Sequence, residues 1–147
     1  MNIVGIDYGD RYLGFAICDS EINVPVPVKS IKIKSMKEAI SVSEEFCKER
    51  NAHLIVIGLP LNVDGTEGER ASKTRSFGKV LEKITGINIV YFDERYSTLE
   101  AKEYLKEGGI KPREMKKYTD KMSAHIILCD FMNNEFKKHI GDNNNGN

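Results

Sequence analysis

The sequence has 147 residues and a mass of 16.6 kDa, a length that suits one domain with its own core and leaves little room for a second. Hydrophobic residues make up 40% of the chain and charged residues 30%, a balance that excludes collagen-like and disordered proteins. Basic and acidic residues are equal at 22 each, so the whole-molecule charge does not indicate a nucleic-acid partner.

Short apolar runs predict strands in the first third of the chain. Ile3–Asp7 and Tyr12–Asp19 flank the turn-compatible residues Tyr8–Arg11, which favours an antiparallel pair. Val24–Ile33 alternates valines with two prolines, and prolines favour an edge strand over a central one.

Three S/T-x-x-E pairs mark helix starts further along the chain, because the hydroxyl and the carboxylate of a capping box bond to free amides of the first turn. They predict helices over about 35–50, 67–84 and 97–107. The pairs are Ser35 with Glu38, Thr66 with Glu69, and Ser97 with Glu100. Each helix is followed by a residue that tolerates left-handed backbone, and these residues are Asn51, Gly86 and Gly108.

The remaining elements complete an α/β pattern. Leu54–Leu59 and Asn88–Phe92 are typical of strands covered on both faces. A last helix is predicted from after Pro112 to about Ile140, followed by a flexible tail at Gly141–Asn147. The order predicts a single domain over 1–140: a mixed five-stranded sheet, three strands antiparallel and the rest parallel, with helices on both faces. The active site of such a sheet lies beyond the carboxyl ends of its strands.

We expect a cytoplasmic protein with free thiols. Apolar runs such as Leu54–Leu61 are far shorter than the roughly 20 residues of a membrane span. Met1 leads into a strand-like segment without a basic and apolar leader. Cys18, Cys47 and Cys129 are odd in number and widely separated, which favours reduced, packing thiols over disulfides or zinc ligands.

Carboxylates from three segments could meet at one edge of the sheet. Asp7 closes the first strand, where a lone buried carboxylate costs several kcal/mol unless it is paired or bound to a cation. Asp93 and Glu94 follow the fifth strand and point to opposite sides, so one of the two is expected to meet Asp7. Asp120 shares a stripe of the last helix with small and apolar side chains. This stripe consists of Ser123, Ala124, Ile127 and Phe131.

Each of these acids also has an ordinary structural interpretation. Asp7 can cap the following turn, Asp93 and Glu94 can be neutralised by Arg95 in a charged loop, and Asp120 can favour the helix dipole.

If the acids converge, divalent cations would relieve their repulsion, which is about 4 kcal/mol for two unit charges 4 Å apart at an effective dielectric constant of 20. Ligands that are all oxygen select Mg²⁺ or Mn²⁺, and paired ions of this kind support phosphodiester cleavage. The histidines are isolated and are interpreted as structural; they are His53, His125 and His139.

Two features could hold phosphates, although a rigid connection and a solvated charged face explain them as well. The loop Gly58–Thr66 leads to a helix start, whose amides bind anions. Between residues 102 and 121 seven basic side chains face four acidic ones, a local charge of +3 that suits a phosphate backbone. A second basic group lines the third strand and its exit: Lys29, Lys32, Lys34 and Lys37.

Four segments resemble, in order, the signature blocks of the YqgF family, also called RuvX, known as Holliday junction resolvases and as nucleases of pre-16S ribosomal RNA. They are GIDYGDRYLGFA from Gly5, GLPLNVDGTEG from Gly58, DERYST from Asp93 and DKMSAHIIL from Asp120. The resemblance implies a ribonuclease H-like fold and a cytoplasmic, metal-dependent nuclease that uses Mg²⁺ or Mn²⁺.

The resemblance implies that Asp7, Glu94 and Asp120 are the catalytic acids and metal ligands, while the choice between Asp93 and Glu94 stays open. Residues expected to hold the substrate are Arg11, Asn62, Thr66, Arg95 and Lys117.

The expected reaction is phosphodiester hydrolysis in the 5′-end maturation of pre-16S rRNA. The alternatives are a resolvase of four-way DNA junctions and a non-catalytic RNA-binding module of ribosome assembly. We expect a nucleic-acid partner, no membrane, and a monomer or weak homodimer. Actin-like ATPases and sugar kinases also carry Asp-x-Gly after a first strand, but they need a second domain that 147 residues do not accommodate.

Overall fold

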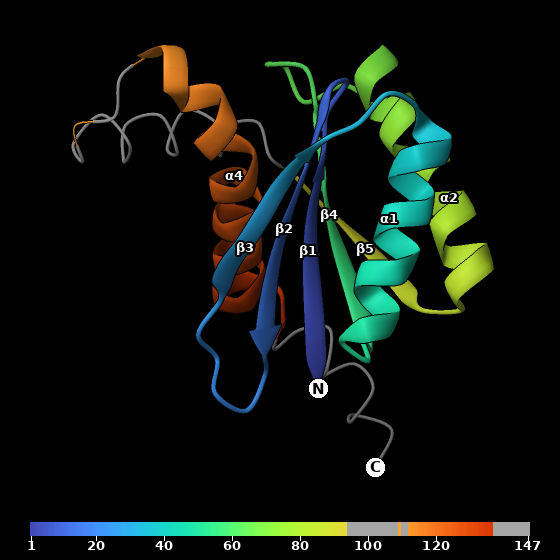
Figure 1. The fold of residues 1–147 in the computed structure, drawn as a ribbon, viewed down its shortest axis with the longest axis vertical. Helices are drawn as coiled ribbons and strands as arrows, with labels where there is room; N and C mark the ends of the chain where they lie inside the picture. Colours follow the sequence, from blue (N-terminus) through green and yellow to red (C-terminus); the bar gives the residue numbers. More distant parts are fainter. Residues whose placement is uncertain (94–108, 110–111, 137–147) are drawn as a thin grey trace.

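A mixed five-stranded sheet forms the centre of the computed structural model (Figure 1), with strand order β3-β2-β1-β4-β5. The structure describes residues 1–93, 109 and 112–136, with side chains in the last range described from 122 onward. The antiparallel strands are β1 (Asn2–Tyr8), β2 (Tyr12–Asp19) and β3 (Val26–Lys32). The strands that continue the sheet in parallel from β1 are β4 (Leu54–Leu59) and β5 (Asn88–Asp93). The predicted mixed sheet is confirmed.

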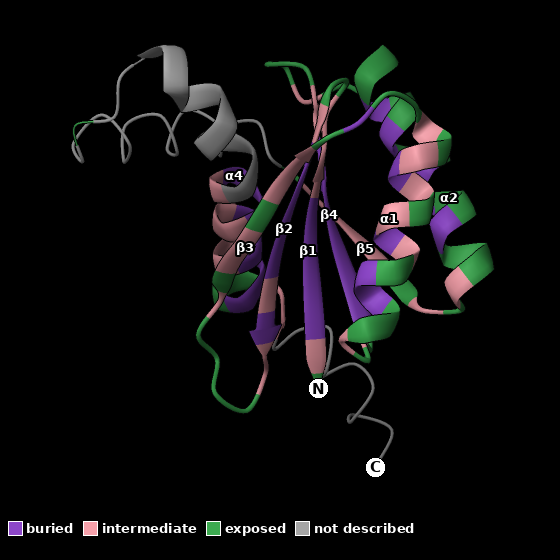
Figure 2. Cartoon of the chain, in the orientation of Figure 1, coloured by how far each residue is buried: buried purple, intermediate pink, exposed green. Residues whose placement is uncertain are grey.

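Helices cover both faces of this sheet, as the sequence predicts (Figure 1). Two helices, α1 (Met36–Glu49) and α2 (Glu69–Thr85), pack on one face, and α4 (Pro112–Asn134) packs on the other. Two separate apolar cores result, one under α1 and α2 and one under α4. The central strands are therefore buried on both sides (Figure 2), which explains their near-continuous apolar sequences.

Alternation along β1 assigns its side chains to the two cores. Val4 and Ile6 belong to the core under α1 and α2. Ile3 belongs to the core under α4, and Gly5 faces Ala124 of that helix. Because successive side chains of a strand point to opposite faces, this alternation decides where the last residues of β1 point.

The helix ends confirm some of the predicted caps. At α1 the Glu38 amide donates to Ser35 Oγ over 3.1 Å, and Glu38 Oε2 accepts from the Lys34 amide over 3.2 Å. Asn51 and Gly86 follow α1 and α2 with φ of 49° and 71°, the left-handed backbone expected there.

The predicted capping box at Thr66 is wrong. The α2 helix begins at Glu69 with Gly68 as its N-cap and no side-chain capping bond. The Thr66 hydroxyl is used inside the preceding loop, where it donates to Asp64 Oδ1 over 2.6 Å. The predicted helix over 97–107 and the tail Gly141–Asn147 lie outside the described residues.

The β3 strand lies at an edge of the sheet, where its prolines predict it. Its register against β2 shifts between Phe15, which pairs with Lys29, and Ala16, which pairs with Pro27. The extra residue on β3 is a bulge that changes which face the following side chains take.

Within the described part of the chain, no helix combines the length and the apolar character that crossing a membrane requires. The three cysteines are free thiols, as predicted: Cys18 and Cys47 are buried and Cys129 is half-buried. Burial raises the pKa of all three thiols, and that of Cys47 to about 12.

Replacing Gly5 by valine is expected to destabilise the fold by about 1–3 kcal/mol. A Cβ at this position would lie 3.2 Å from the Ala124 carbonyl oxygen and 3.2 Å from Leu128 Cβ, so α4 has to move away from the sheet. Urea unfolding measures the change, with Ser76→Ala on the exposed face of α2 as a control expected to shift stability by less than about 0.5 kcal/mol. Equal stability of Gly5→Val and the original protein would contradict the close packing.

The native protein is expected to resist alkylation at Cys47. Its pKa is raised, so the thiol stays neutral at pH 8, and the thiolate is the reactive form. Iodoacetamide followed by mass spectrometry of peptides should label Cys129 first and Cys47 only after unfolding in urea. Because the folded pKa lies above the unfolded one, the contribution of Cys47 to stability is complete below about pH 8.5 and lost toward pH 12. Rapid labelling of Cys47 in the native state would refute this.

Candidate functional site

Three parallel strands end at one edge of the sheet, called here the carboxyl edge. β1 reaches this edge at Asp7 and Tyr8, β4 at Leu59 and β5 at Asp93. Ile6 pairs with Ile57, and Leu59 pairs with Asp93, so these ends lie at similar levels. Ligands of open α/β sheets bind outside the carboxyl ends of strands, which makes this edge the candidate site.

Asp7 is half-buried at this edge. Its side chain follows Ile3 and Gly5 in the alternation of β1, which places it on the face covered by α4. Its partner across the antiparallel pair is Gly14, which carries no side chain. The carboxylate therefore lies on the α4 face of the sheet, and the residue beside it on β2 has no side chain.

The α4 helix approaches β1 closely at the next level below Asp7. Ala124 and Leu128 lie against Gly5, and Ser123 and Ala124 are 1% and 0% exposed. The predicted inward stripe of Ser123, Ala124, Ile127 and Phe131 is confirmed, since all four are buried. Small side chains at this crossing allow the helix backbone to reach the sheet.

The same contact fixes the level of Asp120. The α4 helix runs antiparallel to β1 (Figure 1). From Ala124 back to Asp120 the helix rises about 6 Å, and from Gly5 to Asp7 the strand rises about 6.6 Å in the same direction. The backbone at position 120 is helical and reaches the level of Asp7, whereas the side chain of Asp120 lies outside the described part.

Asp93 points to the other face of the sheet. Phe92 packs edge-on against Phe131 on the α4 side, with ring centroids 6.3 Å apart. Tyr91 lies on the α2 side, where Arg75 stacks 4.9 Å from its ring centroid. Alternation from Tyr91 to Asp93 keeps Asp93 on the α2 side, away from the face that carries Asp7. Glu94 and Arg95 lie outside the described residues.

The loop after β4 is held by its own hydrogen bonds. Asn62 Nδ2 donates to Thr66 Oγ1 over 3.0 Å, and the Asn62 amide donates to the Thr66 carbonyl over 2.8 Å. Asp64 Oδ1 accepts from the amide and the hydroxyl of Thr66, over 2.9 and 2.6 Å. Gly65 takes a φ of 89°, which a glycine adopts without strain. Asn62 and Thr66 thus stand in a defined turn beyond the carboxyl edge.

An ion pair joins this loop to α2. Arg75 Nη2 donates to Glu67 Oε2 over 3.0 Å, and Arg75 Nε bonds the second carboxylate oxygen. The hydrogen bond from Arg75 lowers the pKa of Glu67, and that bond raises the pKa of Arg75 in turn. This arginine is occupied by Glu67 and Tyr91 and does not point freely to a substrate.

The predicted substrate residues are only partly described. Arg11 is exposed in the β1–β2 turn, and its carbonyl accepts the Ile33 amide over 2.8 Å. Arg11, Asn62 and Thr66 lie at the carboxyl edge, while Lys117 is described only as backbone of α4. Tyr12, which was not singled out from the sequence, also lies there, since it pairs with Lys32 of the predicted basic group on the face that carries Asp7. The alternation of side chains along the first two strands could have predicted that Tyr12 lies on the same face as Asp7.

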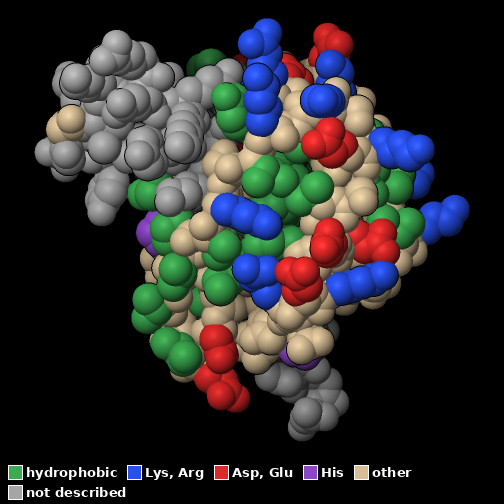
Figure 3. Space-filling model, in the orientation of Figure 1, with side chains coloured by type: hydrophobic (Ala, Val, Ile, Leu, Met, Phe, Trp, Pro, Cys, Tyr) green, Lys and Arg blue, Asp and Glu red, His purple; other side chains and the backbone are tan. Residues whose placement is uncertain are grey.

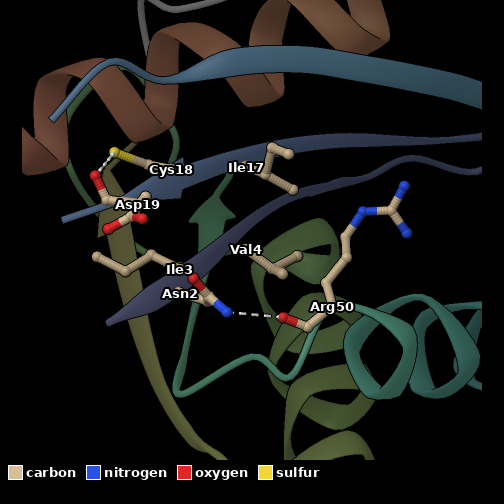
Figure 4. Close-up of a pocket in the computed structure, with 7 residues that line it drawn as sticks. All are labelled: Asn2, Ile3, Val4, Ile17, Cys18, Asp19 and Arg50. Atoms are coloured by element: carbon tan, nitrogen blue, oxygen red, sulfur yellow. Dashed lines mark hydrogen bonds between the residues drawn. The ribbon is translucent and has the colours of Figure 1, made fainter. Parts of the chain in front are cut away.

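A hollow of about 170 Å³ lies at the opposite edge of the sheet, where β1 begins (Figure 4). Its walls are mostly apolar, and Asn2 Nδ2 donates to the Arg50 carbonyl over 3.0 Å there. Its lining residues are Asn2, Ile3, Val4, Ile17, Cys18, Asp19 and Arg50. The hollow is remote from Asp7 and smaller than the roughly 300 Å³ at which ligand pockets begin.

Two of the histidines, interpreted as structural from the sequence, contact backbone groups. His53 Nδ1 accepts the Asn2 amide over 2.9 Å, and a ring nitrogen of His125 lies 3.1 Å from the Pro25 carbonyl. His139 lies outside the described residues.

Comparison with known sequences identifies relatives along almost the whole chain. The family model described as "RuvX: Holliday junction resolvase" matches residues 1–134. A protein of Clostridium tetani is 36% identical over 138 residues, 94% of this chain and 100% of its own. One of Ruminiclostridium cellulolyticum is 38% identical over 133 residues, 90% of this chain and 94% of its own. Both carry the name "Putative pre-16S rRNA nuclease".

Solved structures share the fold. The RuvC protein of T. thermophilus in complex with a Holliday junction substrate superposes with a TM-score of 0.58 at 13% identity, covering 96% of each chain. The Fowlpox virus resolvase with Holliday junction DNA gives a TM-score of 0.59 at 13% identity, covering 93% of this chain and all of that one. The ribonuclease H-like fold expected from the sequence is confirmed.

Replacing Asp64 by alanine is expected to loosen the loop after β4. Two hydrogen bonds from Thr66 to the Asp64 carboxylate are lost, at a cost of about 1–2 kcal/mol for this exposed turn. Amide hydrogen exchange at Thr66 should accelerate, and the thermal midpoint should fall by a few degrees. Val63→Ala is a matched control, because the Val63 side chain is 87% exposed. Unchanged exchange at Thr66 in Asp64→Ala would show that the carboxylate does not order the loop.

Proposed function

Because the chain belongs to the RuvX family, we propose that it is a metal-dependent nuclease that hydrolyses phosphodiester bonds in the 5′-end maturation of pre-16S rRNA. The single observation that supports this best is the placement of Asp7 on the α4 face, at the level that position 120 of α4 reaches. The chain is a nuclease of ribonuclease H-like fold. The proposal of an rRNA substrate rests on the names of relatives that are 36–38% identical over at least 90% of the chain.

The fold family implies a divalent metal ion. Of the proposed ligands only the Asp7 side chain lies among the described residues, and those residues contain no group of three His, Cys, Asp or Glu side chains that could hold a metal. Asp7 offers carboxylate oxygens at a half-buried position on the α4 face, and Gly14 beside it brings no competing side chain. Oxygen ligands with open positions suit Mg²⁺ or Mn²⁺, which we take as the cofactor. Such an ion polarises the phosphate and lowers the pKa of a bound water.

Asp7, Glu94 and Asp120 would hold the metal and form the catalytic set. The face of Asp93 favours Glu94 over Asp93 as the second acid, because Asp93 lies with Tyr91 on the α2 side of the sheet.

The surrounding residues would position the substrate without reading its sequence. Asn62 and Thr66 stand in a hydrogen-bonded turn beyond the strand ends and offer polar contacts to a phosphate or a ribose. Arg11 stands on the other side of Asp7 and is exposed. Arg95 and Lys117 complete the proposed set as further phosphate-binding cations.

A second candidate substrate is a four-way DNA junction. The family description names a Holliday junction resolvase, and the structures that share the fold include resolvases with junction DNA. A resolvase must cut two strands symmetrically and so needs a dimer. We propose a monomer or weak homodimer, which suits trimming of an rRNA end, and a cytoplasmic location where that RNA is processed.

Asp7→Asn is expected to lower cleavage by about two orders of magnitude or more, because the substitution removes the carboxylate charge that would hold the metal. The assay incubates the protein with Mg²⁺ or Mn²⁺ and either a precursor 16S rRNA 5′ leader or a four-way junction. Cleavage of the leader and not of the junction supports rRNA maturation.

A control variant and a measurement of heat stability complete that assay. Asp93→Asn is the matched control and should retain cleavage, because Asp93 faces away from Asp7. Without metal, Asp7→Asn should be as heat-stable as the original protein or more so, since repulsion among the acids is relieved. Full cleavage by Asp7→Asn at saturating Mn²⁺ would overturn the assignment. Tight RNA binding without turnover in the original protein would identify a non-catalytic assembly module instead.

A further inference from the structure

Exposed cations gather beside the carboxyl edge, although the chain as a whole has no net charge. Arg11 lies in the β1–β2 turn, Lys32 ends β3, and Lys34 and Lys37 flank the start of α1. All four side chains are exposed, and none forms an ion pair with a described residue. We call these four residues the β3–α1 basic cluster. Lys and Arg side chains are seen above the strand ends in Figure 3.

Cations elsewhere in the described part are more often neutralised. Lys48 pairs with Glu44, Arg50 with Glu49, Lys73 with Glu69 and Arg75 with Glu67. Within the basic cluster the neighbouring acid Glu38 is engaged by the Lys34 amide in the cap of α1. Asp10 is the other acid beside the cluster, next to Arg11, and among the described residues none of the four cations forms an ion pair.

The backbone holds this cluster in a fixed place relative to Asp7. The Ile33 amide donates to the Arg11 carbonyl over 2.8 Å, which ties the hairpin to the segment between Lys32 and Lys34. Lys32 pairs with Tyr12, two residues along β2 from Gly14, the partner of Asp7. Two strand spacings and two residues of rise separate Asp7 and Lys32, roughly 12 Å between Cα atoms.

The bulge in β3 decides the face that Lys32 takes. After the register shift, Lys29 pairs with Phe15 and Ile31 with Leu13 on the side of α1, so Ser30 and Lys32 face the α4 side. Asp7 is on that same face. A nucleic-acid strand that approaches Asp7 from the β3 edge of the sheet would therefore pass Tyr12 and Lys32.

We propose that the β3–α1 basic cluster binds the phosphodiester backbone of one arm of the substrate, on the β3 side of Asp7. The proposal rests on the proposed nuclease function. A separation of roughly 12 Å is short enough for one nucleic-acid backbone to reach both Asp7 and Lys32 within a few nucleotides. The first-turn amide of Glu38 is already capped by Ser35, so lysine and arginine side chains make the contacts. Contacts of this kind set affinity and register without reading sequence.

The test measures binding in EDTA, where cleavage is prevented, by fluorescence anisotropy at several salt concentrations. The probes are a structured RNA hairpin with a 5′ single-stranded leader and a four-way DNA junction. The variant is Lys32→Ala/Lys34→Ala/Lys37→Ala. The control is Lys48→Ala/Lys79→Ala/Lys83→Ala, which removes the same charge from exposed positions on the second halves of α1 and α2.

The cluster variant should lose on the order of 10- to 100-fold in affinity, and the slope of log K against log salt should become shallower by about 2–3. The control should lose affinity less than threefold. A loss for RNA alone or for junction DNA alone identifies which backbone the cluster holds. Equal losses in both triple variants, or no change in the salt slope, would overturn the proposal.

Failure of this proposal can be distinguished from failure of the nuclease function. If the cluster variant binds normally while Asp7→Asn loses cleavage, only the cluster assignment is wrong. If the original protein neither binds nor cleaves either probe, the nuclease proposal falls with it. Circular dichroism of both triple variants should match the original protein, since every substituted side chain is exposed.

Discussion

The packing of α4 against Gly5 is the contact on which the rest of the site depends. A glycine in the central strand and the small Ala124 in the helix bring two backbones close enough that Ala124 and Leu128 would touch a Cβ at Gly5. This contact sets the height of α4 along β1. Asp7 on the strand and position 120 on the helix then lie at nearly the same distance along the sheet from the contact of Gly5 with Ala124. The level of Asp7 relative to position 120 of α4 is thus a consequence of packing in the core beneath them.

The two faces of the sheet have different roles at the carboxyl edge. The face under α1 and α2 ends in aromatic packing, with Tyr8 stacked on Phe77 and Arg75 on Tyr91. The face under α4 carries Asp7 beside Gly14, with Lys32 two strands away at the end of the edge strand β3. If the proposed acids bind a metal ion beside Asp7, this arrangement suits a polyanion held by the metal at one phosphate and by lysine or arginine at others. The zero net charge of the chain hides this separation.

Most of the fold could be predicted from local patterns, because apolar runs and the Ser35 cap depend on interactions between residues close in the sequence. The start of α2 could not, since the Asp64 carboxylate competes for the hydroxyl and the amide of Thr66 and leaves Gly68 as the cap. Alternation predicted that Asp93 and its neighbour diverge, but only the packing of β5 assigns Asp93 to a face. The face of Lys32 depends on the β3 bulge, which the sequence alone does not locate.

Binding of Mn²⁺ to single variants, followed by electron paramagnetic resonance, tests most directly whether the acids on the α4 face form one metal site. Packing places position 120 level with Asp7, while Asp93 belongs to the other face. Asp120→Asn is expected to weaken Mn²⁺ binding by at least about 10-fold, and Asp93→Asn to leave it unchanged. Weakened binding in Asp93→Asn together with unchanged binding in Asp120→Asn would contradict this account.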